Sequence, residues 1–68
     1  MDPLSPTQLQ HLKDAAKPGG VKPITRTANR LRRLRFVEDR VVRPEGGLLE
    51  GRIFATPAGL DYLRAKER

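Results

Sequence analysis

The first segment of the chain, up to Lys17-Pro18-Gly19-Gly20, carries apolar residues at the three- and four-residue spacing of a helix. Ser5 suits the N-cap, because its hydroxyl can accept from a free backbone N–H of the first turn, and Gln8 completes a capping box. Pro6 suits the first helical position, where no N–H is missed. These signals predict a helix from about Pro6 to Ala16. Its expected buried face is formed by Leu9, Leu12 and Ala16.

The second segment, from Val21 to Arg35, repeats the helical spacing with a far more basic composition. Lys22-Pro23 disfavours helix just before Ile24, so we expect Thr25 or Thr27 to cap a helix that follows. One stripe of this helix is apolar and is formed by Ile24, Ala28, Leu31 and Leu34. The opposite face is polar and is formed by Arg26, Asn29, Arg30 and Arg33.

The remaining sequence predicts a β-hairpin and a closing helix. Phe36-Val37, Val41-Val42 and Arg52-Ile53-Phe54-Ala55 are β-prone, and the stretch 44–51 between them is rich in turn residues. Thr56 is a suitable N-cap with Pro57 as the first helical residue.

The expected core and two ambiguous side chains follow from these elements. The core is expected to contain Leu9, Leu12, Ile24, Leu31, Leu34, Phe36, Ile53, Leu60 and Leu63. His11 is expected on the helix surface, since no second histidine and no cysteine supports a metal site. Phe54 points outward if Ile53 and Ala55 face the core, whereas a bulge would turn it inward, and both alternatives stand open.

The order helix, helix, hairpin, helix resembles the winged-helix domain of bacterial and phage regulators. Residues 27–38 are similar to the recognition helix and its exit, residues 52–60 to the return strand and closing helix, and residues 4–9 to the first helix. The resemblance implies a single small α+β winged-helix domain over residues 1–68, with a recognition helix, a hairpin wing and a C-terminal helix. It also implies DNA binding and a role in transcription regulation.

Two departures from the family pattern change the expected local structure. Arg35 stands where the family places a glycine with positive φ, so we expect a rearranged or mildly strained turn there. The stretch from Lys17 to Ile24 holds two prolines and two glycines, which leaves little room for the usual middle helix. We expect a loop, one turn or a short strand near Val21 instead.

The net charge of +6 is concentrated in the middle of the chain. Residues 1–20 and residues 44–68 each sum to zero, whereas residues 21–43 hold eight basic and two acidic residues. A surface that binds a polyanion requires such a concentration on one element. The alternative is an ordinary solvated helix surface, but no acidic residue lies between Lys22 and Glu38.

Side-chain chemistry makes this helix a candidate for the major groove of double-stranded DNA. Arginine can donate two hydrogen bonds to guanine, and asparagine can pair with adenine in the same bidentate way. The candidates for base contact are Arg26, Asn29, Arg30 and Arg33, and the candidates for phosphate contact at the helix start are Thr25 and Thr27. Arg32 lies off the centre of this face.

The hairpin contribution stays open at this point. Arg43 and Arg52 are candidates for phosphate contact, whereas Glu45 and Glu50 would repel phosphate. Alternatively, the hairpin is structural, and its tip avoids DNA or contacts a protein. Arg40 is expected to pair with Asp39 or Glu38.

Other classes of function lack the necessary residues. The chain has no cysteine, one histidine and no glycine-rich loop between a strand and a helix, so we expect no enzyme activity, no catalytic residue, no metal, no cofactor and no small-molecule ligand. No long apolar run or signal peptide is recognisable, and we expect a cytoplasmic protein without membrane contact.

Two further partners remain as alternatives to DNA. The rivals to DNA binding are a winged-helix protein-interaction module using Phe54, Leu48 and Leu49, and RNA binding by the same helix. A homodimer is expected because a core this small gains little stability. Its expected surfaces are Phe54 and the closing helix from Ala58 to Ala65.

Overall fold

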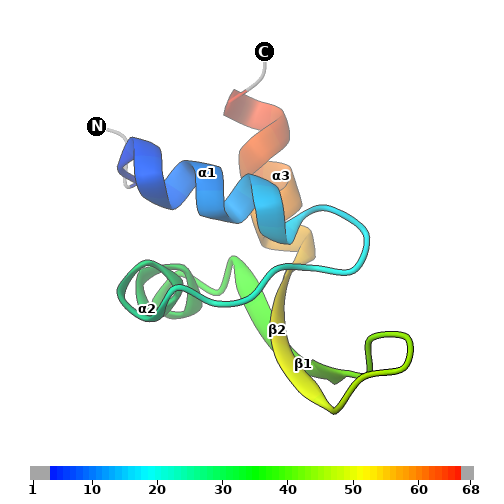
Figure 1. Ribbon diagram of the computed structural model, residues 1–68. Helices are drawn as coiled ribbons and strands as arrows, with labels where there is room; N and C mark the ends of the chain where they lie inside the picture. The colour runs from blue at the N-terminus through cyan, green and yellow to red at the C-terminus, as the bar shows by residue number, and fades with distance from the viewer. Residues whose placement is uncertain (1–3, 67–68) are drawn as a thin grey trace.

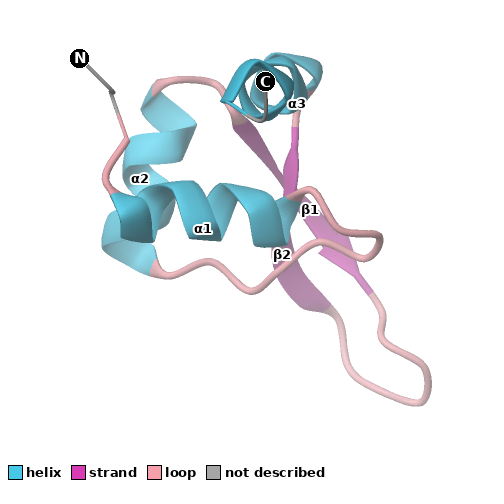
Figure 2. Cartoon of the chain, turned by 90° about the horizontal axis from the view of Figure 1, so that it is seen from above, coloured by secondary structure: helices cyan, strands magenta, loops and turns pink. Residues whose placement is uncertain are grey.

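The computed structural model describes residues 4–66, which form three helices and one two-stranded antiparallel sheet (Figure 1). The elements are α1 (Pro6–Ala15), α2 (Thr25–Arg33), β1 (Val37–Val42), β2 (Glu50–Ala55) and α3 (Pro57–Lys66). The α+β class and the order of the elements are therefore as predicted. Seen from above, α1 lies across α2 and the base of the hairpin, and the hairpin loop projects away from the helices (Figure 2).

Helix α1 begins with the capping box that its sequence predicts. The backbone N–H of Gln8 donates to the Ser5 hydroxyl at 3.2 Å, and the backbone N–H of Ser5 donates to Gln8 Oε1 at 3.0 Å. Two N–H groups that would otherwise lack partners are thereby satisfied. Local signals alone fix this helix start.

Helix α2 begins differently from the prediction. Thr25 is the first helical residue, and Ile24 holds the N-cap position with an extended backbone (φ −90°, ψ 110°) and no side-chain cap. Capping by Thr25 or Thr27 is therefore wrong. Placing Ile24 in the core is also wrong, because its side chain is 58% exposed. A residue before the helix start does not share the helical stripe, and only Ala28 and Leu31 of that stripe are fully buried.

The linker between α1 and α2 contains no helix, as its prolines and glycines predict. Val21 instead forms an isolated antiparallel bridge with Ile53, with N–H···O distances of 3.1 and 2.9 Å in the two directions. Gly20 has φ +67°, and a Cβ there would lie 2.6 Å from the Ile53 carbonyl oxygen. The absence of a side chain at Gly20 therefore allows the linker to approach β2.

The turn from α2 into β1 keeps a positive φ at a non-glycine residue. Arg35 has φ 60°, and its N–H donates to the Arg32 carbonyl at 3.0 Å. The N–H of Phe36 donates to the Leu31 carbonyl at 3.0 Å, which completes a Schellman-type helix end. The left-handed conformation costs a residue with a Cβ about 1–2 kcal/mol, so the expected mild strain is present.

The hairpin has a continuous register, with Val37 opposite Ala55 and Asp39 opposite Ile53. Because no bulge interrupts the register, Phe54 lies on the face opposite to the buried Ile53, which settles the two alternatives in favour of the outward one. The Phe54 ring is half-buried, with the Arg40 guanidinium 5.1 Å from its centroid.

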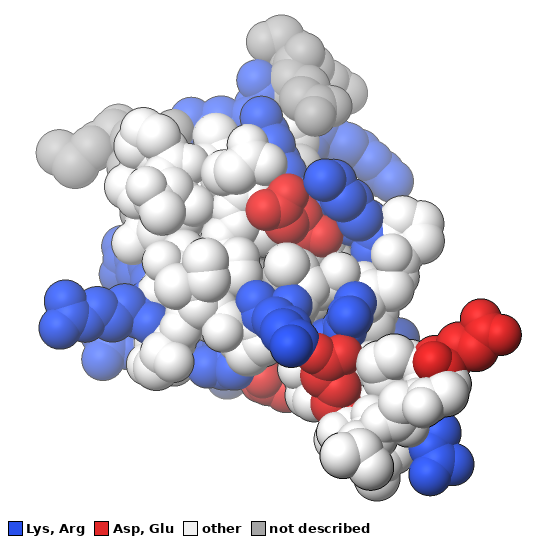
Figure 3. Space-filling model, viewed as in Figure 1, with Lys and Arg blue, Asp and Glu red and all other residues white. Residues whose placement is uncertain are grey.

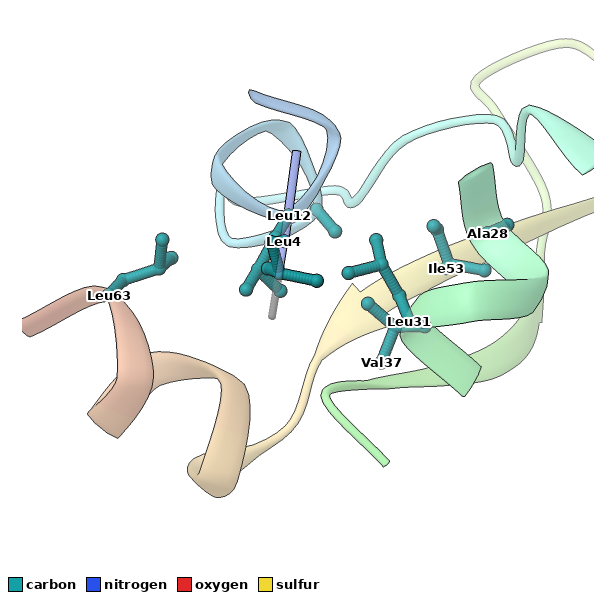
Figure 4. Close-up of a cluster of buried hydrophobic side chains, with 8 residues drawn as sticks. Leu4, Leu12, Ala28, Leu31, Val37, Ile53 and Leu63 are labelled. Atoms are coloured by element: carbon teal, nitrogen blue, oxygen red, sulfur yellow. The ribbon is translucent and has the colours of Figure 1, made fainter. Parts of the chain in front are cut away.

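The core lies where α1, α2, the hairpin base and α3 meet (Figure 4). Of the expected core residues, Leu12, Leu31, Ile53 and Leu63 are buried, and Leu9, Leu34, Phe36 and Leu60 are half-buried. The buried core also contains Leu4, Ala15, Ala28 and Val37, which are not among the expected residues. The Phe36 and Tyr62 rings stack at the edge of this core, with centroids 4.9 Å apart.

His11 is buried, so the expectation of a surface residue is wrong. Its side chain is 3% exposed, and Nε2 accepts a hydrogen bond from the backbone N–H of Ile24 at 3.2 Å. Burial lowers the pKa of His11, and the charge of Arg32 acts in the same direction while that of Asp14 opposes it. The neutral imidazole therefore ties α1 to the start of α2. Within residues 4–66, no helix is long and apolar enough to cross a membrane.

Candidate nucleic-acid interface

The polar face of α2 is turned to solvent, because the opposite face buries Ala28 and Leu31 against the core. All four base-contact candidates are exposed, namely Arg26, Asn29, Arg30 and Arg33. Lys and Arg side chains project around α2 at the lower left of Figure 3, while acidic side chains lie nearer to α1 and the hairpin. The structure therefore brings together the face that helical spacing predicts.

Charge neutralisation differs between this face and the rest of the molecule. Within residues 4–66, no carboxylate forms an ion pair with Arg26 or Arg33. Several cations outside this face are paired: Arg40 with Glu38, as one of the two expected alternatives, and Lys22 with Glu50 at 2.9 Å. Arg26 and Arg33 therefore keep their charge available to an anion on the outer face of α2, as does the exposed Arg43 beyond β1.

The start of α2 offers backbone donors beside these cations. No side chain of the described residues caps this helix, and Thr25 is exposed while Thr27 is half-buried. The first N–H groups of a helix lack intrahelical partners and carry the positive end of its dipole. Both properties favour a phosphate group at this position. Thr25 and Thr27 thus lie where phosphate contact is possible, although neither acts as the cap.

The two hairpin arginines have different environments. Arg43 is exposed just beyond the end of β1. Arg52 is half-buried, and its guanidinium donates to Glu50 at 3.1 Å and to the Gly19 carbonyl at 3.2 Å. Its hydrogen bonds are therefore with β2 and with the linker before Val21, and not with α2. Glu50 faces two cations, Lys22 and Arg52, so its charge is largely compensated within the chain.

A cluster that sequence reasoning missed joins α2 to β1. Arg32 Nε donates to both carboxylate oxygens of Asp39, at 3.2 and 3.1 Å, and Nη2 donates to Oδ1 at 2.7 Å. Arg32 Nη1 donates on its other side to Asn29 Oδ1 at 2.9 Å. The hydrogen bonds to Asp39 raise the pKa of Arg32. The contact spans a helix and a strand, and only its Asn29–Arg32 half has a recognisable helical spacing.

Within residues 4–66, no three His, Cys, Asp or Glu side chains are grouped as metal ligands. A shallow groove of about 360 Å³ lies between α1 and the start of α2. It is lined by Pro6, Thr7, Gln10, His11, Asp14 and Ile24.

Comparisons with family models, with curated proteins and with solved structures find no match to this chain. The winged-helix resemblance therefore rests on the residues that carry it and on the order of the elements.

Proposed function

We propose that this chain is a winged-helix protein that binds double-stranded DNA by inserting α2 into the major groove, as a small transcriptional regulator or a phage-type accessory factor. The observation that carries the proposal is the exposed outer face of α2. It combines Arg26, Arg30 and Arg33 with one asparagine, Asn29. Neither Arg26 nor Arg33 forms an ion pair with an acidic residue among residues 4–66. A helix with this composition supplies both phosphate attraction and base-edge hydrogen bonds.

The order of elements agrees with the proposal. Helix α2 is followed by a hairpin and then by α3, which is the order that the winged-helix resemblance implies. The hairpin projects from the same body as α2 and carries the exposed Arg43 beyond its first strand (Figure 1). In this proposal Arg43 contacts phosphate, whereas Arg52 holds the hairpin to the linker.

Catalysis has no place in the proposal. The only histidine, His11, is buried and its Nε2 is occupied by a backbone N–H, so it cannot serve as a surface base in this conformation. A binding protein of this size gains contacts by pairing, and we therefore include a homodimer on DNA in the proposal.

The test is a fluorescence-anisotropy titration of a random duplex, a single strand and a duplex RNA at about 50 and 200 mM salt. We expect the DNA duplex to bind most tightly. Three phosphate contacts would weaken binding about 40-fold across this salt range, because log K falls by about 0.9 per contact and decade. Equal binding of the RNA would favour the RNA alternative, and no binding to any nucleic acid would refute the proposal.

A second candidate function is protein binding through the hairpin. Leu48 and Leu49 are 88% and 69% exposed at the hairpin tip, and Val41 is 70% exposed. Two adjacent exposed leucines at a projecting loop are a candidate contact surface for a protein. Partner binding that persists at high salt and is lost when Leu48 and Leu49 are replaced by serine would support this function over DNA binding.

A further inference from the structure

The inference concerns what holds the exposed Asn29 side chain in one orientation. The planar guanidinium of Arg32 uses one edge, Nε and Nη2, for the Asp39 carboxylate and offers Nη1 to Asn29 Oδ1. Paired contacts of this type are directional, because the donors form a rigid fork that matches a carboxylate. Asp39 in β1 therefore fixes the guanidinium of Arg32, and Arg32 in turn contacts the amide of Asn29.

The chemistry of the two groups then sets the orientation of the amide. Arginine has donors and no acceptor, so only the oxygen of the Asn29 amide can face Nη1. The amide NH₂ is consequently directed away from Arg32. Oδ1 has two lone pairs, of which Arg32 occupies one. Asn29 thus retains a donor and an acceptor for another molecule, in a defined orientation.

The cluster has little to contribute to folding stability. The side chains of Arg32 and Asp39 are 33% and 60% exposed, and ion pairs exposed to solvent contribute little to stability. An acidic residue beside α2 also weakens its attraction for phosphate. A surface that served only as a cationic patch would bind nucleic acid better without Asp39. Orientation of Asn29 is therefore the main consequence of the cluster.

We propose that Arg32 and Asp39 are positioning residues that hold Asn29 ready to read adenine in the major groove. The Asn29 NH₂ donates to adenine N7, and the free lone pair of Oδ1 accepts from the adenine N6 amino group. Neither Arg32 nor Asp39 contacts the base. This inference rests on the proposed DNA binding and adds the base-pair class that one position of the site prefers.

The experiment starts with selection of binding sites from a randomised duplex library by the wild-type chain. Anisotropy is then measured on the selected site and on single-base variants for the wild type, Asn29→Ala, Arg32→Ala and Asp39→Asn. One bidentate contact gives a preference between about 5- and 150-fold. We expect Asn29→Ala to lose this preference at an A·T pair, and Arg32→Ala and Asp39→Asn to lose most of it at the same pair.

A matched control separates positioning from charge. Glu38→Gln removes an acidic residue from the same strand, where Glu38 pairs with Arg40 and not with Arg32. Both Asp39→Asn and Glu38→Gln should bind random duplex as tightly as the wild type or more tightly, but only Asp39→Asn should lose the adenine preference. General damage to the fold would weaken binding to every duplex, which circular dichroism and melting would reveal.

The contradicting results are distinct from failure of the proposed function. If Asp39→Asn and Arg32→Ala keep the preference that Asn29→Ala loses, the positioning role is overturned while DNA binding stands. If Asn29→Ala changes no base preference, the reading role of Asn29 is overturned. If the wild-type chain enriches no duplex, the proposed DNA binding fails, and this inference fails with it.

Discussion

Replacing Gly59 by alanine sets two effects of opposite sign against each other. Gly59 lies in the first turn of α3, where alanine has a helix propensity about 1 kcal/mol better than glycine. A Cβ at this position, however, would lie 2.2 Å from the carbonyl oxygen of Phe36 and 3.2 Å from Cδ1 of Leu12. Helix propensity predicts a more stable protein, whereas the contact with Phe36 predicts a less stable one.

The geometry decides between the two effects. Carbon and oxygen atoms in close contact normally stay about 3.3 Å apart, so α3 would have to move by roughly 1 Å. That movement disturbs the hydrogen bonds from Thr56 to the Phe36 carbonyl (2.9 Å) and from the Thr56 hydroxyl to the Arg35 carbonyl (2.7 Å). Overpacking costs about 1–3 kcal/mol, and weakening the two hydrogen bonds costs about 1 kcal/mol more in total. The net loss after the propensity gain is about 2 kcal/mol.

Thermal and urea unfolding followed by circular dichroism measure this loss. For a domain of this size the melting temperature should fall by about 8–16 °C. Gly51→Ala is the matched control, because a Cβ at Gly51 meets no atom within 4 Å. A Gly59→Ala protein that melts at or above the wild-type temperature would show that α3 does not lie against Phe36 as described.

Three further predictions concern the core, pH and assembly. Leu31→Ala should cost about 2–5 kcal/mol because Leu31 is fully buried, whereas Leu48→Ala, at an 88% exposed site, should stay within about 0.5 kcal/mol, and equal melting temperatures would contradict the core assignment. Burial makes the pKa of His11 lower in the folded chain than its unfolded value of about 6.5, so this contribution to stability should be complete above that pH and be lost as the pH falls below it. In urea titrations this pH dependence should disappear in His11→Gln, and its persistence would assign it to another group. Sedimentation at saturating duplex should show two chains per site, and monomers both free and bound would refute the homodimer.

Sequence alone predicts those features that depend on neighbouring residues. The capping box of Ser5 and Gln8 and the start of α3 at Thr56-Pro57 are set within a few residues, and the Gly59 N–H donates to the Thr56 hydroxyl at 3.1 Å as an N-cap requires. The exposed face of α2 follows in the same way from helical spacing. Each of these features is independent of how the elements pack.

Features that depend on how the elements pack are not predicted by the sequence pattern. Counting helical spacing back from Ala28 places Ile24 in the core, but Ile24 lies before the helix start, where the backbone is extended. The burial of His11 depends on an acceptor role towards a backbone N–H thirteen residues later in the chain. The Arg32–Asp39 contact depends on where β1 passes α2, and spacing along the chain does not specify that distance.

The most direct test of DNA binding through α2 compares Arg30→Ala with Arg32→Ala on a random duplex. Each variant removes one positive charge from the same helix, so the general electrostatic attraction changes equally. Arg30 lies at the middle of the exposed face, whereas Arg32 is held by Asp39. We predict that both variants fold, that Arg30→Ala reduces the salt slope by about one contact, and that Arg30→Ala weakens binding to random duplex more than Arg32→Ala does. Equal losses would reduce the helix to a diffuse cationic surface, and no loss from either folded variant would contradict DNA binding through α2.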